Sequence, residues 1–147
     1  MLQRPVNRFV GASLAVAAMA MTLLSSSCAK RTPARTARIP RIGETQSGIA
    51  SWYGHPYHGR RAANGEVYDM HKLTAAHRTW AFDTIVRVRN LSNDREVDVR
   101  ITDRGPFVRG RIIDLSRAAA EYIDLVRPGV TKVKLKVLRT PSAKRKP

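Results

Sequence analysis

Apolar and polar residues alternate in three segments of the chain, and alternation of this kind predicts strands with one buried face. In residues 84–90 the valines fall on one side and the arginines on the other. Residues 95–101 repeat the pattern, and the intervening Leu-Ser-Asn-Asp is typical of a turn, so the two segments predict a hairpin. Residues 131–138 alternate again, and we expect their lysines to pair across a strand with Glu96 and Asp98.

One segment has the features of a helix. Ser116 is a good N-cap, residues 117–126 contain strong helix formers, and Pro128-Gly129 is typical of a helix end. Short strands, one helix and long polar connections together favour a small closed barrel, because closure removes exposed sheet edges. Residues 48–138 are about 90 residues, enough for one such domain.

The N-terminal end of the chain predicts export. Residues 1–27 carry two arginines, then an apolar run, then small residues, which is typical of a secretory signal peptide. The apolar run at 9–24 is shorter than the roughly 18 residues of a membrane-spanning helix. Cys28 follows the signal and is the single cysteine, so an intrachain disulfide is impossible.

The position of Cys28 resembles a bacterial lipoprotein cleavage site, at which the cysteine becomes the lipidated N-terminus. Such sites usually have Leu three residues earlier, where this chain has Ser25. Lipidation would hold the protein to a membrane. The alternative is ordinary cleavage, which would leave a soluble periplasmic protein. Because Ala29 rather than aspartate follows the cysteine, the resemblance implies the outer membrane if the host has one.

The net charge of +16 is concentrated in the flanks of the predicted domain. Residues 28–47 and 139–147 are basic and lack apolar periodicity, so they predict a disordered linker and a disordered tail. A pI near 11.3 would suit a nucleic-acid-binding protein. Export argues against that class, since the partners outside the cytoplasm are anionic lipid headgroups and wall polymers. We expect no nucleic-acid partner.

Five short motifs occur in order along the domain. They are Gly48-x-Ala50-Ser51-Trp52-Tyr53-Gly54, Ala63-Asn64-Gly65-Glu66, Leu73-Thr74-Ala75-Ala76-His77, Asp103-Arg104-Gly105-Pro106-Phe107 and Ile113-Asp114-Leu115-Ser116. Through them the sequence resembles the RlpA (rare lipoprotein A) family, which includes lytic transglycosylases of the bacterial cell wall. The resemblance implies a mainly β fold, a six-stranded double-psi β-barrel with one short helix. Asp83 stands where the family pattern usually has Gly, which predicts a reshaped turn beside His77.

Acidic residues in loops and at strand ends are the candidates for chemistry. A lytic transglycosylase needs one acid to protonate the glycosidic oxygen and then, as base, to take the proton of the muramyl 6-hydroxyl. Asp103 ends a predicted strand, so its carboxylate is expected in a loop at the barrel mouth, and Asp114 ends another segment just before the predicted helix. The alternatives are that Asp103 is a turn residue and that Asp114 stabilises the helix N-terminus. Glu66 and Asp69 are near each other in a loop, so one of them is expected to keep its proton to a higher pH.

The resulting hypothesis divides the polar residues into two groups. Catalysis is assigned to Asp103, Asp114 and Glu66, and substrate binding to Asp69, His77, Tyr53 and Asn64. His77 is expected to orient a carboxylate or to bind the sugar, and Asn64-Gly65 is also an ordinary turn signal. The four histidines have no recognisable ligand spacing, so no metal or cofactor is predicted.

The sequence therefore predicts a monomeric, periplasm-facing lipoprotein that cleaves peptide-free peptidoglycan strands to 1,6-anhydromuramyl ends. Two alternatives stay open. One is a non-catalytic, expansin-like protein that binds glycan and loosens the wall. The other is a structural envelope protein whose basic flanks do the binding.

Overall fold

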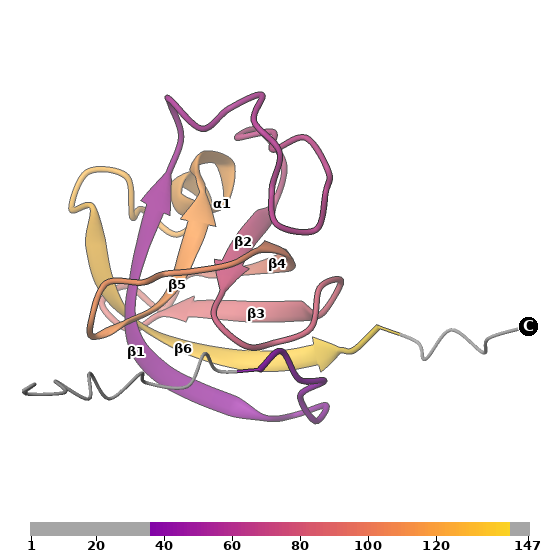
Figure 1. Cartoon of the computed structure of the whole chain (residues 1–147). Coiled ribbons are helices and arrows are strands. Elements are labelled where there is room, and N and C mark those ends of the chain that lie inside the picture. Colours follow the sequence, from indigo (N-terminus) through magenta and orange to yellow (C-terminus); the bar gives the residue numbers. More distant parts are fainter. Residues whose placement is uncertain (1–35, 142–147) are drawn as a thin grey trace, which may run out of the picture. The chain divides into compact units, whose positions relative to one another are not determined.

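The computed structural model describes residues 36–141, which contain a closed six-stranded barrel and one helix (Figure 1). The strands are β1 (Thr45–Tyr53), β2 (Thr74–His77), β3 (Ile85–Asn90), β4 (Glu96–Asp103), β5 (Arg111–Ser116) and β6 (Val130–Arg139). Around the barrel they follow the order β1-β5-β2-β4-β3-β6. β1 pairs in parallel with β5, and β2 in parallel with β4; the remaining pairs are antiparallel. The predicted fold class is confirmed.

The barrel interior is filled by the apolar side of each alternating strand. The buried residues include Val86 and Val88 of β3, Val97, Val99 and Ile101 of β4, and Val133, Leu135 and Val137 of β6. β3 and β4 are the two strands of the predicted hairpin. The period-2 pattern therefore identified these three strands and their buried faces correctly.

The expected partners of the β6 lysines were wrong. β6 lies between β1 and β3 and does not adjoin β4, so Lys136 lies opposite Arg87. The guanidinium of Arg87 instead forms ion pairs with Glu96 and Asp98 on β4. Strand order, which alternation does not encode, decides which charged residues meet.

The helix α1 (Arg117–Tyr122) is shorter than the predicted 117–126. Ser116 caps it as expected, because its hydroxyl accepts a hydrogen bond from the backbone N–H of Ala119. The chain leaves the helix where Asp124 adopts a left-handed conformation (φ 53°), and Ile123 and Leu125 on either side are fully buried. Within residues 36–141 no helix has the length and apolar character needed to cross a membrane.

Residues 36–44, here called the strap, pack against the barrel, although the sequence placed them in a disordered linker. The N–H of Arg38 donates to the carbonyl of Thr79, and its own carbonyl accepts from the N–H of Ala81. The Arg38 guanidinium binds both carboxylate oxygens of Glu44 and lowers the pKa of that carboxyl to about 2. The predicted boundary at Gly48 is therefore too late, because β1 begins at Thr45 and the strap precedes it.

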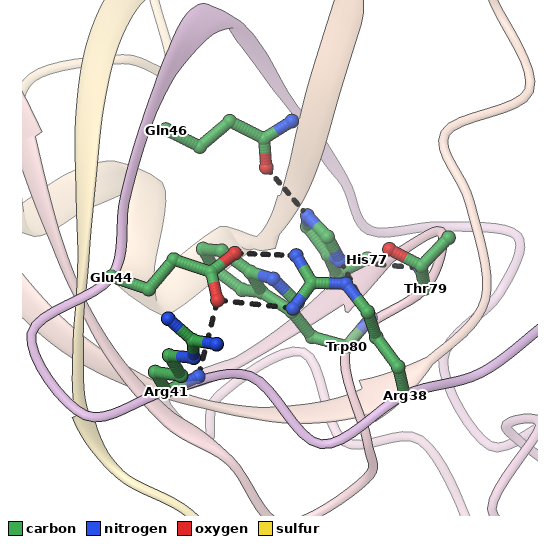
Figure 2. Close-up of polar contacts among 7 residues, drawn as sticks. All are labelled: Arg38, Arg41, Glu44, Gln46, His77, Thr79 and Trp80. Carbon is green, nitrogen blue, oxygen red and sulfur yellow. Dashed lines mark hydrogen bonds and ion pairs between the residues drawn. The ribbon is translucent and has the colours of Figure 1, made fainter.

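Beneath the strap, Trp80 stacks on the ring of His77 with 4.1 Å between ring centroids (Figure 2). The backbone N–H groups of Thr79 and Trp80 both donate to His77 Nδ1, so the ring proton is on Nε2, which donates to Gln46 at 3.0 Å. Burial, followed by the positive charge of Arg104, Arg38 and Arg78, lowers the pKa of His77 to about 4. His77 is a buried, neutral residue that joins β2 to β1.

Asp83, which replaces the usual Gly of the family pattern, adopts a left-handed conformation (φ 65°). Glycine adopts this conformation without strain. The Asp83 carboxylate accepts a hydrogen bond from Arg100 at 2.8 Å. The backbone of this turn therefore suits Gly, and the aspartate adds an ion pair with Arg100 of β4.

We expect a chain beginning at residue 48 to unfold at a lower temperature than one beginning at residue 36. The shorter chain lacks the strap and the first three residues of β1, which pair with β6. Each hydrogen bond contributes about 1 kcal/mol, and a loss of about 1 kcal/mol lowers the melting temperature of a small domain by roughly 4–8 °C. Circular dichroism measures the two melting temperatures, and equal values would contradict the inclusion of the strap in the domain.

A second prediction concerns pH. The folded-state pKa of His77, about 4, lies below the ordinary value of 6.5, so its stabilising contribution is complete above pH 6.5 and is lost as the pH falls toward 4. The loss is at most roughly 3.5 kcal/mol, from about 1.4 kcal/mol per pKa unit. His77→Gln should remove this pH dependence from the free energy of unfolding, measured by urea denaturation between pH 7 and 4. The exposed His71 supplies the control, since His71→Gln should leave the wild-type slope in place.

Candidate active site

A cleft of about 490 Å³ opens where β1, β4 and β5 meet the loop between β4 and β5. Its lining consists of Ser51, Trp52, Tyr53, Tyr57, Ala76, Asp103, Arg104, Gly105, Pro106, Phe107, Val108, Arg111 and Asp114. Three of the predicted site residues, Asp103, Asp114 and Tyr53, therefore line one cavity. They come from three strands: Asp103 and Asp114 from the consecutive strands β4 and β5, and Tyr53 from β1, which is distant in the sequence.

Asp114 lies inside β5 and not at its end, which corrects the prediction. The parallel register pairs it with Ser51 of β1, whose hydroxyl donates to Asp114 Oδ1 at 2.5 Å. On the other carboxylate oxygen, Arg111 donates at 3.3 Å. The alternative role at the helix N-terminus finds no support, since within residues 36–141 the Asp114 carboxylate bonds to Ser51 and Arg111 and not to the helix.

The environment of Asp114 raises the pKa of its carboxyl. Burial is the largest influence and raises its pKa, because a low-dielectric surrounding disfavours the charged form. The hydrogen bond from Ser51 and the charges of Arg111 and Arg78 act in the opposite direction and are weaker. Asp114 can therefore hold a proton longer than an ordinary aspartate, and its anion is still supported once the proton leaves.

Asp103 is the last residue of β4, as predicted, and has a different environment. Its Oδ1 accepts hydrogen bonds from the backbone N–H groups of Ala63 at 2.9 Å and Arg104 at 2.7 Å. The contact with Arg104 agrees with the reading as a turn residue, while the contact with Ala63 ties the distant 63–66 motif to the cleft. The two aspartates thus differ in their partners: a hydroxyl and a guanidinium for Asp114, main-chain amides for Asp103.

Tyr53 is largely enclosed by protein. Its ring stacks on Tyr68 with 4.4 Å between centroids, and its buried hydroxyl has no hydrogen-bond partner within residues 36–141. Burial, followed by the negative charge of Asp103, raises the pKa of Tyr53, so the phenol stays protonated. The buried phenol of Tyr53 therefore lies close enough to Asp103 and Asp114 for their charges to raise its pKa.

The exposed aromatic residues of the cleft are Tyr57 and Phe107, which are 52% and 85% exposed. They lie on separate loops, after β1 and after β4. The sequence reasoning favoured Tyr53 for sugar contact and did not single out these two. Phe107 belongs to the fourth motif, yet its exposure could not be inferred from an apolar letter in a loop.

Glu66 and Asp69 do not line the cleft; they border a separate small hollow on the side of β4. Arg100 donates to both carboxylate oxygens of Glu66, at 2.9 and 2.6 Å, and this hydrogen bonding lowers the pKa of Glu66. The pKa of Asp69 is also lowered, chiefly by a hydrogen bond from the N–H of His71. The expectation that one of these acids retains its proton is wrong, because each has its own donors. Their functional roles stay predictions.

Asn64 and His77 also lie outside the cleft lining. Asn64 Oδ1 accepts from the N–H of Glu66 at 3.0 Å, and Gly65 has a positive φ of 91°, which is the arrangement of a turn. His77 borders a smaller hollow of about 140 Å³, and within the described residues neither ring nitrogen hydrogen-bonds a carboxylate. The expected orienting of a carboxylate by His77 is therefore not observed. Sugar binding by these two residues stays a prediction.

The sequence did not point to three polar residues: Ser51 and Arg111, which line the cleft, and Arg78, which lies outside the lining but whose charge acts on Asp114. Ser51 belongs to the first motif, but its contact with Asp114 follows from the parallel register, which the sequence pattern does not reveal.

In the part of the chain that the structure describes, no group of three or more His, Cys, Asp or Glu has a metal-binding arrangement.

Comparison with known proteins places this geometry in a family. A family model described as lytic transglycolase matches residues 45–135. The endolytic peptidoglycan transglycosylase RlpA of Campylobacter jejuni is 54% identical over 100 residues, which are 68% of this chain and 36% of that protein. The protein of the same name from Helicobacter pylori strain J99 is 53% identical over 97 residues, 66% of this chain and 31% of that protein. This chain thus spans about a third of the length of the curated relatives it matches.

Solved structures agree on the fold. The Streptomyces papain inhibitor superposes with a TM-score of 0.57 and 26% identity, over 69% of this chain and 100% of that chain. The apo-expansin of Clavibacter michiganensis gives a TM-score of 0.53 and 18% identity, over 68% of this chain and 53% of that chain. The likeness to the expansin concerns the fold alone, which is the expected double-psi β-barrel. Because the family model runs from the first residue of β1 into β6, the chain belongs to the lytic transglycolase family, the family of the RlpA proteins.

Proposed function

We propose that this domain is a peptidoglycan lytic transglycosylase in which Asp114 transfers the proton. The observation that carries the proposal is the pair of aspartates in unlike environments within one cleft. Paired acids of unlike environment are a common basis for glycosidic bond cleavage. The activity in the names of the RlpA relatives supports the same reaction.

The first step is protonation of the bond. Asp114, whose pKa is raised by burial, gives its proton to the glycosidic oxygen, and the bond from that oxygen to the anomeric carbon of the muramyl sugar breaks. The resulting carboxylate is stabilised by Ser51 and Arg111, which already donate to its two oxygens. No group has to move to receive the new charge.

The second step closes the ring. The Asp114 carboxylate takes the proton of the muramyl 6-hydroxyl, and the oxygen of that hydroxyl bonds to the anomeric carbon to form the 1,6-anhydro ring. Asp114 is again protonated, and no water is consumed. Asp103, held by two backbone N–H groups, places a carboxylate near the positive charge that develops at the anomeric carbon. Glu66, ion-paired with Arg100 outside the cleft, is less suited to donate a proton.

Substitution of the acids tests the assignment. Asp114→Asn should lower turnover of peptide-free glycan strands by a factor of about 10² or more, in the range of a positioned general acid–base, and Asp103→Asn should also lower it. Glu66→Gln should have a smaller effect. New anhydromuramyl ends are counted by mass spectrometry, and the exposed Asp94 provides the matched control as Asp94→Asn.

Melting temperatures must accompany these rates, because an unfolded variant says nothing about mechanism. Full activity in both aspartate variants would refute the roles given to them. Wild-type protein that binds strands without producing anhydro ends would instead support the non-catalytic, expansin-like glycan-binding protein.

We also propose that the protein acts as a monomer, lipidated at Cys28 and facing the periplasm. Cys28 lies outside the described residues, and the support for its lipidation is the signal-like sequence of residues 1–27. The strap begins at residue 36, so a fully extended chain from Cys28 would reach about 28 Å at most. An anchored barrel would therefore work close to its membrane, which is the outer membrane if the host has one.

Fractionation tests the anchor. Cys28→Ser should move the protein from the membrane fraction to the soluble periplasm, because the variant has no thiol to acylate. Immunoblots of the two fractions measure the shift. Unchanged fractionation would contradict lipidation at this position.

A further inference from the structure

The loop of residues 104–110 forms one wall of the cleft through residues 104–108, which include its most exposed aromatic side chain, Phe107. None of these residues belongs to a helix or strand, although all are described by the structure. A loop of this kind is ordinarily mobile, because few hydrogen bonds hold its backbone. An aromatic side chain that contacts a ligand from a mobile loop would lose binding energy to the ordering of that loop.

The guanidinium of Arg78 is hydrogen-bonded to the backbone of this wall. Its Nε donates to the carbonyl oxygen of Pro106, and one terminal nitrogen donates to the carbonyls of Val108 at 2.7 Å and Arg111 at 3.2 Å. The three carbonyls lie on both sides of Phe107 in the sequence. Arg78 follows β2 directly, so the loop is attached to the barrel itself.

We propose that Arg78 is a positioning residue, which fixes Phe107 as a platform for a sugar ring beside the two aspartates. The proposal rests on the proposed function in taking glycan as the ligand. Phe107 is 85% exposed and contributes little to the core, yet it borders the same cavity as Asp103 and Asp114. An aromatic face at the rim of a polar cleft is suited to the apolar face of a pyranose ring.

An arginine is needed for this arrangement. The planar guanidinium presents several N–H donors in fixed directions, whereas a lysine ammonium is a compact point charge on a flexible stem. Arg78→Lys therefore keeps a positive charge near Asp114 but cannot reproduce the contacts with three carbonyls. Arg78→Met removes both the charge and the contacts. The two variants separate geometry from charge.

Binding is measured first, in an Asp114→Asn background so that turnover does not interfere. Phe107→Ala should weaken the affinity for peptide-free glycan strands about tenfold, as expected for an aromatic anchor, and Arg78→Lys should have a similar effect. The double variant Arg78→Lys/Phe107→Ala should bind within about a factor of two of Phe107→Ala alone, because both changes remove one platform. Arg109→Met, on the same loop but outside the cleft lining, should bind like the background protein.

Kinetics with the native acid in place give a second measurement. Arg78→Lys should raise KM, lower kcat/KM and leave the pH profile of kcat near that of the wild type, since the positive charge remains. A Lys variant with wild-type affinity would overturn the proposal, because charge alone would then suffice. Effects of Arg78→Lys and Phe107→Ala that multiply in the double variant would overturn it too, since Arg78 would not act through Phe107.

The melting temperature of each variant shows whether the barrel is intact. If Arg78→Met fails to fold, Arg78→Lys and the double variant still decide the question. If glycan strands incubated with the wild-type protein gain no new anhydro ends, the proposed catalytic function is wrong, and the binding test is unaffected. If Phe107→Ala binds glycan strands with unchanged affinity, the proposed role of Phe107 is wrong, and the proposed catalytic function is unaffected.

Discussion

The parallel pairing of β1 and β5 is the constraint on which the site depends. Its register places Ser51 beside Asp114, so the hydroxyl reaches the carboxylate at 2.5 Å. Ile113 and Leu115, on either side of Asp114, are fully buried in the core, and alternation along a strand therefore turns Asp114 to the opposite side. A shift of one residue in this register would bury the acid in the barrel and expose the core. Core packing and the position of the acid are thus fixed by the same pairing.

The sequence revealed the parts of the fold that local alternation determines. β3, β4 and β6 alternate along their length, so their apolar residues identified strands and buried faces. β2 does not alternate, because all four residues of Thr74–His77 are buried. The strap gave no signal either: its arginines have the composition of a solvated linker, and the Arg38–Glu44 pair that secures it depends on the folded chain. Strand order and parallel pairing are properties of the whole barrel, and no local pattern contains them.

The motifs indicated which residues to consider for the site, but not where each of them lies in the fold. Asp103 and Asp114, which the resemblance to RlpA proteins singled out, line one cavity, but only Asp103 ends a strand. The environments of the other residues depend on partners distant in sequence. Glu66 pairs with Arg100, and His77 bonds to Gln46, and neither partner could be identified from spacing. The sequence shows which residues are acidic or basic, but the pKa of each group depends on its neighbours in the folded chain.

A single acid that gives up a proton and later takes one back needs a pKa that is neither very high nor very low. In Asp114 burial raises the pKa, while Ser51, Arg111 and Arg78 oppose that rise. Arg78 has a second set of contacts, two carbonyls of the wall that carries Phe107 and the carbonyl of Arg111, where β5 begins. The same guanidinium thus acts on the carboxyl of Asp114 and is hydrogen-bonded to the loop beside it. In the proposed mechanism, a substitution that preserved only this charge would leave Asp114 nearly unchanged while removing hydrogen bonds from the wall. Proton transfer and sugar binding would then be linked through one side chain but remain separable.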